Sequence, residues 1–236
     1  MKKLSSAIAL LAALSSTSTF AAEAGSHIIK FGAGLANYNS ESTELSDDMG
    51  MGTALTPAGV TAVAEDHSVT LITYDYFLTD NWSVQFAAGT PPTVQQTAAG
   101  TGAALGKVGE TKAMTPAVIG LYHFDLGNKL SAYVGAGVNY TKFMDVEIYE
   151  SYEHAFGGES KGSIDDSVGG VVKVGANYAL TDKWSVDLAY SRYWITSDIE
   201  VTTDTPIQGM GNVDVARNIS IDVDPDIYSL TVGYQF

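Results

Sequence analysis

The side chains with catalytic or metal-binding chemistry are few and scattered along this sequence. Four histidines, His27, His67, His123 and His154, lie in four different segments, and none stands in a recognisable pattern with a serine and an acid. A hydrolase or acyltransferase needs a nucleophile and a base within hydrogen-bond reach, although only a folded structure decides whether distant residues meet. The chain has no cysteine, which excludes a disulfide framework and a thiolate metal site. We therefore expect no enzyme.

Two further patterns have weak chemical interpretations. The glycines at 32 and 34 and at 135 and 137 lack the strand-turn-helix context of a nucleotide-binding loop. Glycine in a strand more often relieves crowding, here inside a barrel. Asp222 and Asp224 could hold a divalent cation, or they form the solvated base of a loop. We expect neither a cofactor nor a metal ion.

A different group of polar residues occurs singly within alternating, otherwise apolar segments. A charge facing lipid at mid-depth costs roughly 2–4 kcal/mol, so in a membrane barrel such residues belong in the interior. Alternation places there Lys30, Asp75, Gln85, His123, Asn139, Lys173 and Asp187. They either pair and fill the lower half of a narrow interior, or line a polar floor beneath an apolar funnel.

Two nearly identical stretches indicate the elements that must position these side chains. Residues 76–86 read YFLTDNWSVQF and residues 178–188 read YALTDKWSVDL. Each is an alternating strand, a polar turn and a second alternating strand that begins with tryptophan. Period-two alternation predicts a sheet with one apolar and one polar face. Aromatic residues beside such turns are typical of strand ends at a membrane interface, where we expect Trp82, Trp184, Tyr234 and Phe236.

The alternation extends through the chain and predicts eight strands. The first five cover about residues 27–38, 66–78, 82–89, 115–124 and 130–143. The sixth strand precedes the turn at 181–183, the seventh follows that turn and runs on toward residue 199, and the eighth ends at Phe236. Three short turns, at 79–81, 125–129 and 181–183, alternate with long polar stretches at 39–65, 90–113, 144–165 and 197–218. We expect the long stretches to be outer loops and the short turns to be periplasmic.

Eight antiparallel strands with apolar faces can hide their edges by closing into a barrel. The predicted fold class is therefore all-β: an eight-stranded antiparallel up-and-down transmembrane β-barrel, whose closure pairs every backbone group in lipid. A secreted soluble barrel or sandwich would show the same alternation. The polar face is rich in Gly, Ala and Ser, which suits a narrow interior, and the apolar face in Tyr, Trp and Leu, which suits lipid. These compositions favour the membrane.

The N-terminus and the charge balance agree with export. Lys2 and Lys3, an apolar run and small residues ending at Ala21 predict a signal peptide over residues 1–21, with Ala24 as a second cleavage position. Residues 22–236 would then form the barrel domain. Without the two N-terminal lysines, 10 basic residues face 27 acidic ones, a formal charge of −17. That balance argues against a nucleic-acid partner, which demands a basic face.

The inward parity also includes apolar residues, several of them toward the long-loop end: Val69, Leu71, Ile119, Leu121, Tyr133, Phe143 and Val171. Apolar groups there would suit a hydrophobic ligand. Arg192 breaks the pattern because it stands at an outward position. It either extends toward lipid phosphates at the outer interface or turns inward at a bulge.

Several motifs carry a family resemblance. The stretches TDNW at 79–82, AAGTP at 87–91, MTP at 114–116, YVGAGVNYT at 133–141, DSVG at 166–169 and VGYQF at 232–236 resemble the OmpW family, which includes the AlkL-type proteins. The resemblance implies an outer-membrane barrel, set in outer-membrane lipids, that passes small hydrophobic molecules. It also implies that the C-terminal strand ends in a signal for the barrel-assembly machinery.

Three prolines bear on how such a molecule would leave the barrel. Pro91, Pro92 and Pro116 should sit at similar heights near the outer end of one hairpin. Each lacks the N–H of a ladder hydrogen bond. The resemblance suggests that they leave a lateral gap in the wall, whereas the residues alone equally allow that they only end the strands.

Three classes of function remain open on the sequence. The first is a passive channel for small hydrophobic solutes. The second is a non-conducting structural or adhesive barrel whose loops bind a partner, and the third is a barrel lipid enzyme. Uptake of an apolar solute into liposomes separates the first from the second, and lipid turnover by the purified protein reveals the third.

Overall fold

The computed structural model describes residues 23–50 and 55–236. The predicted signal peptide, residues 1–21, lies outside the described residues and stays a prediction. In the described part of the chain, no helix is long and apolar enough to span a bilayer.

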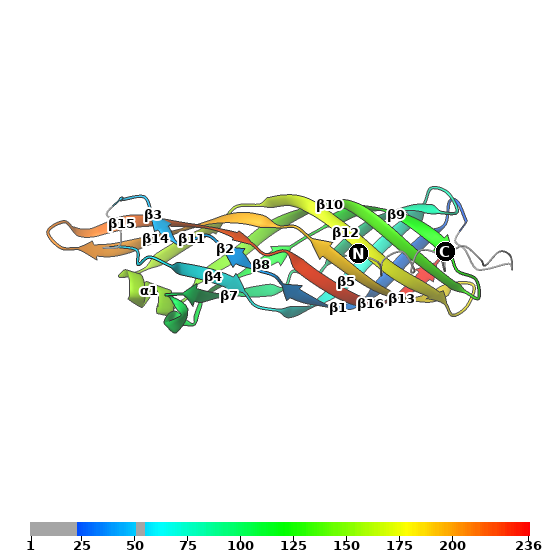
Figure 1. The fold of residues 1–236 in the computed structure, drawn as a ribbon, viewed down its shortest axis with the longest axis horizontal. Helices are drawn as coiled ribbons and strands as arrows, with labels where there is room; N and C mark the ends of the chain where they lie inside the picture. Colours follow the sequence, from blue (N-terminus) through cyan, green and yellow to red (C-terminus); the bar gives the residue numbers. More distant parts are fainter. Residues whose placement is uncertain (1–22, 51–54) are drawn as a thin grey trace, which may run out of the picture.

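Eight antiparallel strands close into a barrel (Figure 1), and the last strand pairs back onto the first. In ring order they are β1 (His27–Tyr38), β5 (His67–Phe77), β6 (Trp82–Gly89), β9 (Ala117–Asp125), β10 (Leu130–Ile148), β12 (Ser167–Ala179), β13 (Trp184–Tyr193) and β16 (Pro225–Gln235). Closure gives each strand a partner on both sides, so the ring has no exposed edge. The predicted fold class is confirmed.

Burial alternates along the barrel strands as the sequence pattern requires. Phe31 is 62% exposed while its neighbour Lys30 is 3% exposed. On β13, Leu188 is 63% exposed while Asp187 is 2% exposed. The outer surface is therefore apolar and the interior carries the polar side chains, which is the arrangement that a barrel in lipid needs.

Aromatic rings gather on the outer surface at the end of the barrel that carries the three short turns, here called the short-turn end. Trp82 packs on Tyr122 with ring centroids 5.0 Å apart, and Trp184 packs on Tyr234 at 4.9 Å. The ring of Phe236 stacks on His27. These rings stand where the apolar belt meets the polar turns.

Glycine makes room for large side chains in the narrow interior. A Cβ atom at Gly175 would lie 2.4 Å from the ring of Tyr133, and one at Gly135 would lie 2.5 Å from a methyl group of Leu121. Both distances are too short for real contacts, so these positions accept only glycine while Tyr133 and Leu121 fill the interior.

The four long stretches are not simple loops, which corrects the sequence prediction. They build an extension that continues the barrel wall away from the short-turn end (Figure 1). Its elements are the part of β10 from Lys142 onward, β2 (Glu41–Ser42), β3 (Ser46–Asp47), β4 (Val60–Ala64), β7 (Thr93–Gly100), the 3₁₀-helix η2 (Ala103–Leu105), β8 (Lys107–Met114), α1 (Glu150–Phe156), β11 (Ser160–Ile164), β14 (Thr196–Ile207) and β15 (Gly211–Asp222).

The extension consists of two sheets around a small core. In one, the far half of β10 pairs with β8, which pairs with β7 and then β4. In the other, β11 pairs with β14, and β15 pairs with β14, β2 and β3. The core between them contains Leu45, Val60, Tyr152, Phe156, Val201 and Ile219. The sequence pattern missed these strands because their outer faces meet water and are rich in Thr, Asp and Glu.

Candidate functional site

A connected polar cluster crosses the barrel interior toward the short-turn end. The Lys30 ammonium lies 2.9 Å from Asp75 Oδ2 and 3.1 Å from Asp187 Oδ2, and all three side chains are buried. Gln85 Nε2 donates to Asp75 Oδ1, and Lys173 Nζ donates to Gln85 Oε1 at 2.7 Å. Strands β1, β5, β6, β12 and β13 each contribute one side chain, so the cluster ties distant parts of the ring together.

Tyr133 on β10 completes this cluster. Its place among the polar residues was not visible in the sequence because its ring is apolar. Its hydroxyl donates to Asp187 Oδ1 at 2.8 Å, and Lys30 Nζ lies 5.2 Å from its ring centroid. The sequence predicts Tyr133 in the apolar lining, and its ring does lie in the buried apolar core with Ile119 and Leu121, while its hydroxyl joins the charges. The polar plug is the name used here for this set: Lys30, Asp75, Gln85, Tyr133, Lys173 and Asp187.

The two remaining polar candidates lie beside the plug or apart from it. His123 is inside the barrel beside Tyr133, its partner on the adjacent strand, and its Nε2 forms a 2.8 Å hydrogen bond with Ser83 Oγ. Asn139 is buried higher up, where its Nδ2 donates to the Gly170 carbonyl at 2.7 Å. Asn139 therefore secures the wall between β10 and β12 and is not part of the plug.

The plug balances its own charges. Two ammonium groups face two carboxylates, all enclosed by the barrel wall. Removing one partner of a buried ion pair leaves an uncompensated charge and typically costs about 3–5 kcal/mol. An apolar molecule passing this level would have to separate such pairs without replacing their hydrogen bonds, so the plug is a barrier to apolar solutes.

Cavities lie on both sides of the plug and share no lining residue. The vestibule, on the short-turn side, has a volume of about 240 Å³ and is lined by Lys30, Asp75 and His123, and by polar residues of the turns such as Asp80 and Lys183. The barrel cavity lies on the opposite side and is mainly apolar. The plug thus separates a polar compartment from an apolar one.

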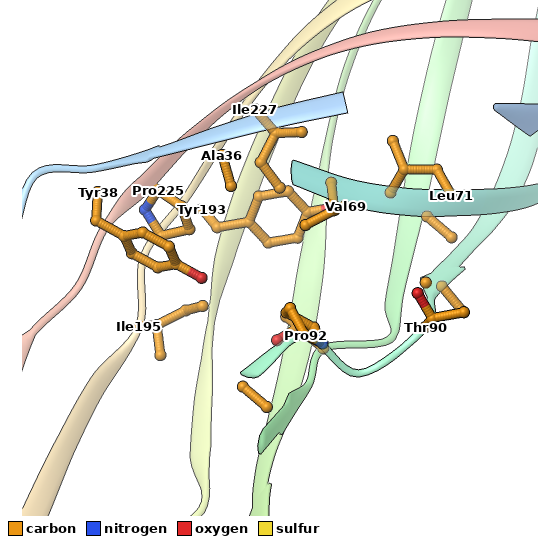
Figure 2. Close-up of a pocket in the computed structure, with 15 residues that line it drawn as sticks. Ala36, Tyr38, Val69, Leu71, Thr90, Pro92, Tyr193, Ile195, Pro225 and Ile227 are labelled. Atoms are coloured by element: carbon orange, nitrogen blue, oxygen red, sulfur yellow. The ribbon is translucent and has the colours of Figure 1, made fainter. Parts of the chain in front are cut away.

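The barrel cavity collects apolar side chains from five barrel strands, β1, β5, β6, β13 and β16, and from the proline segment after β6. Figure 2 shows Tyr193, Ile227 and Val69 pointing toward one another across it, with Pro92 on the facing side. Val69 and Leu71 were predicted for such a lining. Tyr193 and Ile227 were not, although Tyr193 shares the inward parity of Asp187 and could have been found from it.

The other predicted apolar residues lie at different levels. Ile119, Leu121 and Val171 are fully buried inside the barrel wall. Phe143 lies higher, lining the middle cavity, a small cavity between the barrel and the extension that also contacts Val94 and Ile221.

The apolar cavities form a series along the molecule. The middle cavity and the barrel cavity share Tyr38, Ala113, Thr115 and Ile195 in their linings. A third, the distal cavity, lies in the core of the extension and shares Gln96, Ile164 and Ile199 with the middle cavity. Adjoining cavities therefore share walls, from the extension down into the barrel.

The barrel wall is interrupted beside the barrel cavity. Pairing between β6 and β9 ends at Ala87 and Ala117, and the hairpin resumes where the Ala113 N–H donates to the Pro92 carbonyl at 3.2 Å and Thr93 of β7 pairs with Lys112 of β8. Pro91 and Pro116 lie in the segments between these points that have no ladder pairs, and Pro92 stands where the hydrogen bonds resume. The prolines thus interrupt a long hairpin that continues beyond them.

A groove on the outer, lipid-facing surface meets the same interruption. This wall groove is lined by Pro116, Ala117 and outward apolar side chains such as Phe86 and Val118. Ala87 and Ala88 line both the wall groove and the barrel cavity. The inner cavity and the outer groove are therefore two sides of one thin part of the wall.

Arg192 faces outward. The register of β13 with β12 and β16 runs through it without a bulge, and its guanidinium lies 3.3 Å from Asp226 and 3.8 Å from Asp224. The inward alternative is therefore wrong.

The two aspartates considered for a divalent cation accept hydrogen bonds from the protein. The Ile195 N–H donates to Asp224 Oδ1, and the Thr196 hydroxyl donates to Asp222 Oδ1. Among the described residues, no group of acidic or histidine side chains could hold a metal ion.

Comparisons with known proteins agree with this architecture. A profile of the OmpW family matches residues 23–236. The chain belongs to the OmpW family. It is 32% identical to outer membrane protein W of Vibrio cholerae over 238 residues, which cover 100% of both chains. It is 28% identical over 210 residues to outer membrane protein AlkL of Ectopseudomonas oleovorans, covering 86% of this chain and 81% of AlkL.

Solved structures show the same fold. The crystal structure of the outer membrane protein OprG from Pseudomonas aeruginosa matches with a TM-score of 0.77 at 22% identity, covering 93% of this chain and 99% of OprG. The solid-state NMR structure of AlkL in DMPC lipid bilayers matches with a TM-score of 0.55 at 22% identity, covering 94% of each chain. The predicted family and the bacterial outer-membrane location are confirmed.

Proposed function

We propose that this barrel carries small hydrophobic molecules into the outer membrane and releases them sideways through its wall. The solute moves through the distal, middle and barrel cavities and leaves at the interruption between Ala88 and Pro116. The observation that carries this proposal is the shared lining of the barrel cavity and the wall groove by Ala87 and Ala88. On this proposal the short turns face the periplasm and the extension faces outward.

The energetics favour the lateral route over the axial one. An apolar solute gains free energy when it moves from a cavity into hydrocarbon. Continuing along the axis would take it through the polar plug, where Lys30 bridges Asp75 and Asp187, and then into the polar vestibule. The family resemblance points to the same class of solute.

The test restores the backbone ladder at the interruption. In one variant, Pro91, Pro92 and Pro116 are replaced by threonine, which supplies the missing N–H groups and favours strands. Uptake of octane and of a small polar solute is measured in proteoliposomes. We expect octane uptake to fall several-fold while heat-modifiable folded barrel persists. Unchanged octane uptake by the folded variant would rule out the wall as the route.

A control separates transport from the structural or adhesive alternative. Octane uptake by the unsubstituted protein must exceed that of protein-free liposomes. A folded barrel that gives no increase is non-conducting, and its extension would then serve to bind a partner.

A further inference from the structure

A tyrosine hydroxyl in the barrel cavity has no hydrogen-bond partner. Tyr193, the last residue of β13, lines this cavity and is only 7% exposed. Figure 2 shows its ring reaching across the cavity toward Val69, so the hydroxyl at the far end of the ring lies within the cavity. Among the described residues, none places a hydrogen bond or a charge on this hydroxyl. A buried O–H donor without an acceptor is costly.

The other tyrosine of the cavity already uses its donor. Tyr38 Oη lies 3.5 Å from His67 Nε2, and His67 Nδ1 lies 3.4 Å from the Glu65 carbonyl oxygen. Because a carbonyl oxygen only accepts, Nδ1 carries the proton, and Nε2 of the neutral ring is left to accept from the Tyr38 hydroxyl. The two tyrosines therefore face the cavity in different states, one engaged and one free.

The rest of the lining is neutral and mostly apolar. The Thr115 hydroxyl is hydrogen-bonded to Thr141 at 3.1 Å, and Thr90 is exposed. The cavity has no charged residue in its lining, whose larger side chains are aliphatic, as at Leu71 and Ile227. A charged group placed here would lose its hydration without gaining a partner. The cavity therefore suits a neutral molecule that is mainly hydrocarbon.

The free hydroxyl defines the one polar group that such a molecule should carry. An alkane leaves the Tyr193 donor without an acceptor. An alcohol can accept from Tyr193 but brings a donor of its own, which then needs an acceptor. A ketone oxygen only accepts, so it satisfies the hydroxyl and adds no new demand. The volume of the cavity, about 70 Å³, suits a short chain.

We propose that the barrel cavity binds short apolar ketones, the carbonyl oxygen accepting a hydrogen bond from Tyr193 Oη. The hydrocarbon part of the ketone lies against Leu71, Ile195 and Ile227. This rests on the proposed function, because it names a class of solute that is retained beside the interruption in the wall, where Ala88 lines the same cavity. Tyr193 is then a residue that determines specificity.

The test compares two ligands of the same shape. In 2-methylbut-1-ene a CH₂ group replaces the oxygen of butan-2-one, so only the ketone can accept a hydrogen bond. Binding of each is measured by NMR titration of the full-length protein in lipid nanodiscs, after subtraction of binding to empty nanodiscs. We expect Tyr193→Phe to weaken butan-2-one binding about fivefold, as one neutral hydrogen bond would, and to leave 2-methylbut-1-ene binding unweakened.

The NMR signal of the ketone gives a second, independent readout. The ¹³C resonance of a carbonyl carbon moves to higher chemical shift when its oxygen accepts a hydrogen bond. Bound butan-2-one should show this displacement in the unsubstituted protein and lose it in Tyr193→Phe. The substitution removes one oxygen that has no partner and keeps the ring, so we expect the barrel to fold.

Tyr38→Phe is the matched control, because it removes a hydroxyl from the same cavity whose donor His67 already takes. It should leave the affinities for both ligands unchanged. A loss of butan-2-one binding equal to that of Tyr193→Phe would show that the effect is not specific to Tyr193, and would overturn the assignment.

Three other results would also overturn it: no binding of butan-2-one to the folded unsubstituted protein, butan-2-one binding unaffected by Tyr193→Phe, or equal weakening of both ligands by that substitution. Binding to the cavity does not require passage through the wall. Failure of octane uptake in proteoliposomes would instead overturn the transport proposal, so the two failures are distinguishable.

Discussion

The charged residues of the interior act as a set. Their inward placement follows from the cost of a charge in lipid, and the sequence was sufficient to assign Lys30, Asp75 and Asp187 to one face. The sequence does not show which residues pair, because partners such as Lys30 and Asp187 are 157 positions apart. For Tyr133 the sequence predicts the apolar lining, where its ring does lie, and only its contact with Asp187 shows the role of the hydroxyl.

The first prediction concerns this mutual dependence. Lys30→Met leaves two carboxylates facing a single ammonium, and we expect the free energy of unfolding to drop by about 3–5 kcal/mol. Adding Asp187→Asn to Lys30→Met restores the charge balance and should recover part of that loss. Both are measured by urea unfolding in lipid vesicles.

Lys112→Met is the matched control, because the pair of Lys112 with Asp145 is half-exposed or more on both sides. It should change the free energy of unfolding by less than about 1 kcal/mol. A Lys30→Met variant as stable as Lys112→Met would show that the plug does not behave as a coupled set.

At the level of elements, the barrel was predictable and the extension was not. Barrel strands face lipid on one side, so their alternation is strong, and the predicted bounds of β1 and β6 coincide with the structure. In β14 the buried positions include Thr203 and Thr205, which read as loop residues. The pairing with β15 stabilises this segment, and that partner is visible only in the fold.

The closing strand shows how a terminal element can control assembly. β16 pairs with β13 on one side and β1 on the other, and the Phe236 N–H donates to the His27 carbonyl at 3.2 Å. The second prediction is that deletion of Phe236 strongly reduces the amount of folded barrel in the outer membrane. The deletion removes an aromatic ring at the membrane interface and the backbone hydrogen bond from Phe236 to His27 of the first strand.

The measurement is the fraction of heat-modifiable, protease-resistant protein in isolated outer membranes. Phe236→Trp keeps an aromatic ring and the backbone link, and should fold at close to normal levels. Equal amounts of folded barrel from the deletion and from the unsubstituted chain would refute this role of the terminal residue.

At the scale of the whole molecule, the barrel and extension form one elongated body (Figure 1). The plug lies toward the short-turn end, and the apolar cavities lie on its other side. The prolines were recognisable in the sequence as breaks in a hairpin. Their position beside a cavity was not, because the cavity is assembled from strands far apart in the chain, such as β1, β13 and β16. The lateral route depends on the prolines lying beside this cavity.

The chain has no cysteine, so a reversible disulfide can close the wall. Ala88 and Pro116 stand one step beyond the last pair of the β6–β9 ladder. Because paired positions on adjacent strands are within disulfide range, a disulfide between cysteines at these two positions would extend the ladder by one pair and draw the two segments together. The control pair is Val84→Cys with Gly120→Cys, which are paired on the same two strands below the interruption. A Cβ atom at Gly120 meets nothing closer than 3.8 Å.

The most direct measurement is octane uptake by proteoliposomes carrying the Ala88→Cys/Pro116→Cys variant, oxidised and then reduced, with alkylation used to count free thiols. Lateral release predicts that oxidation lowers octane uptake several-fold, that reduction restores it, and that the control pair changes nothing. Equal octane uptake by the fully oxidised and reduced forms would contradict the account.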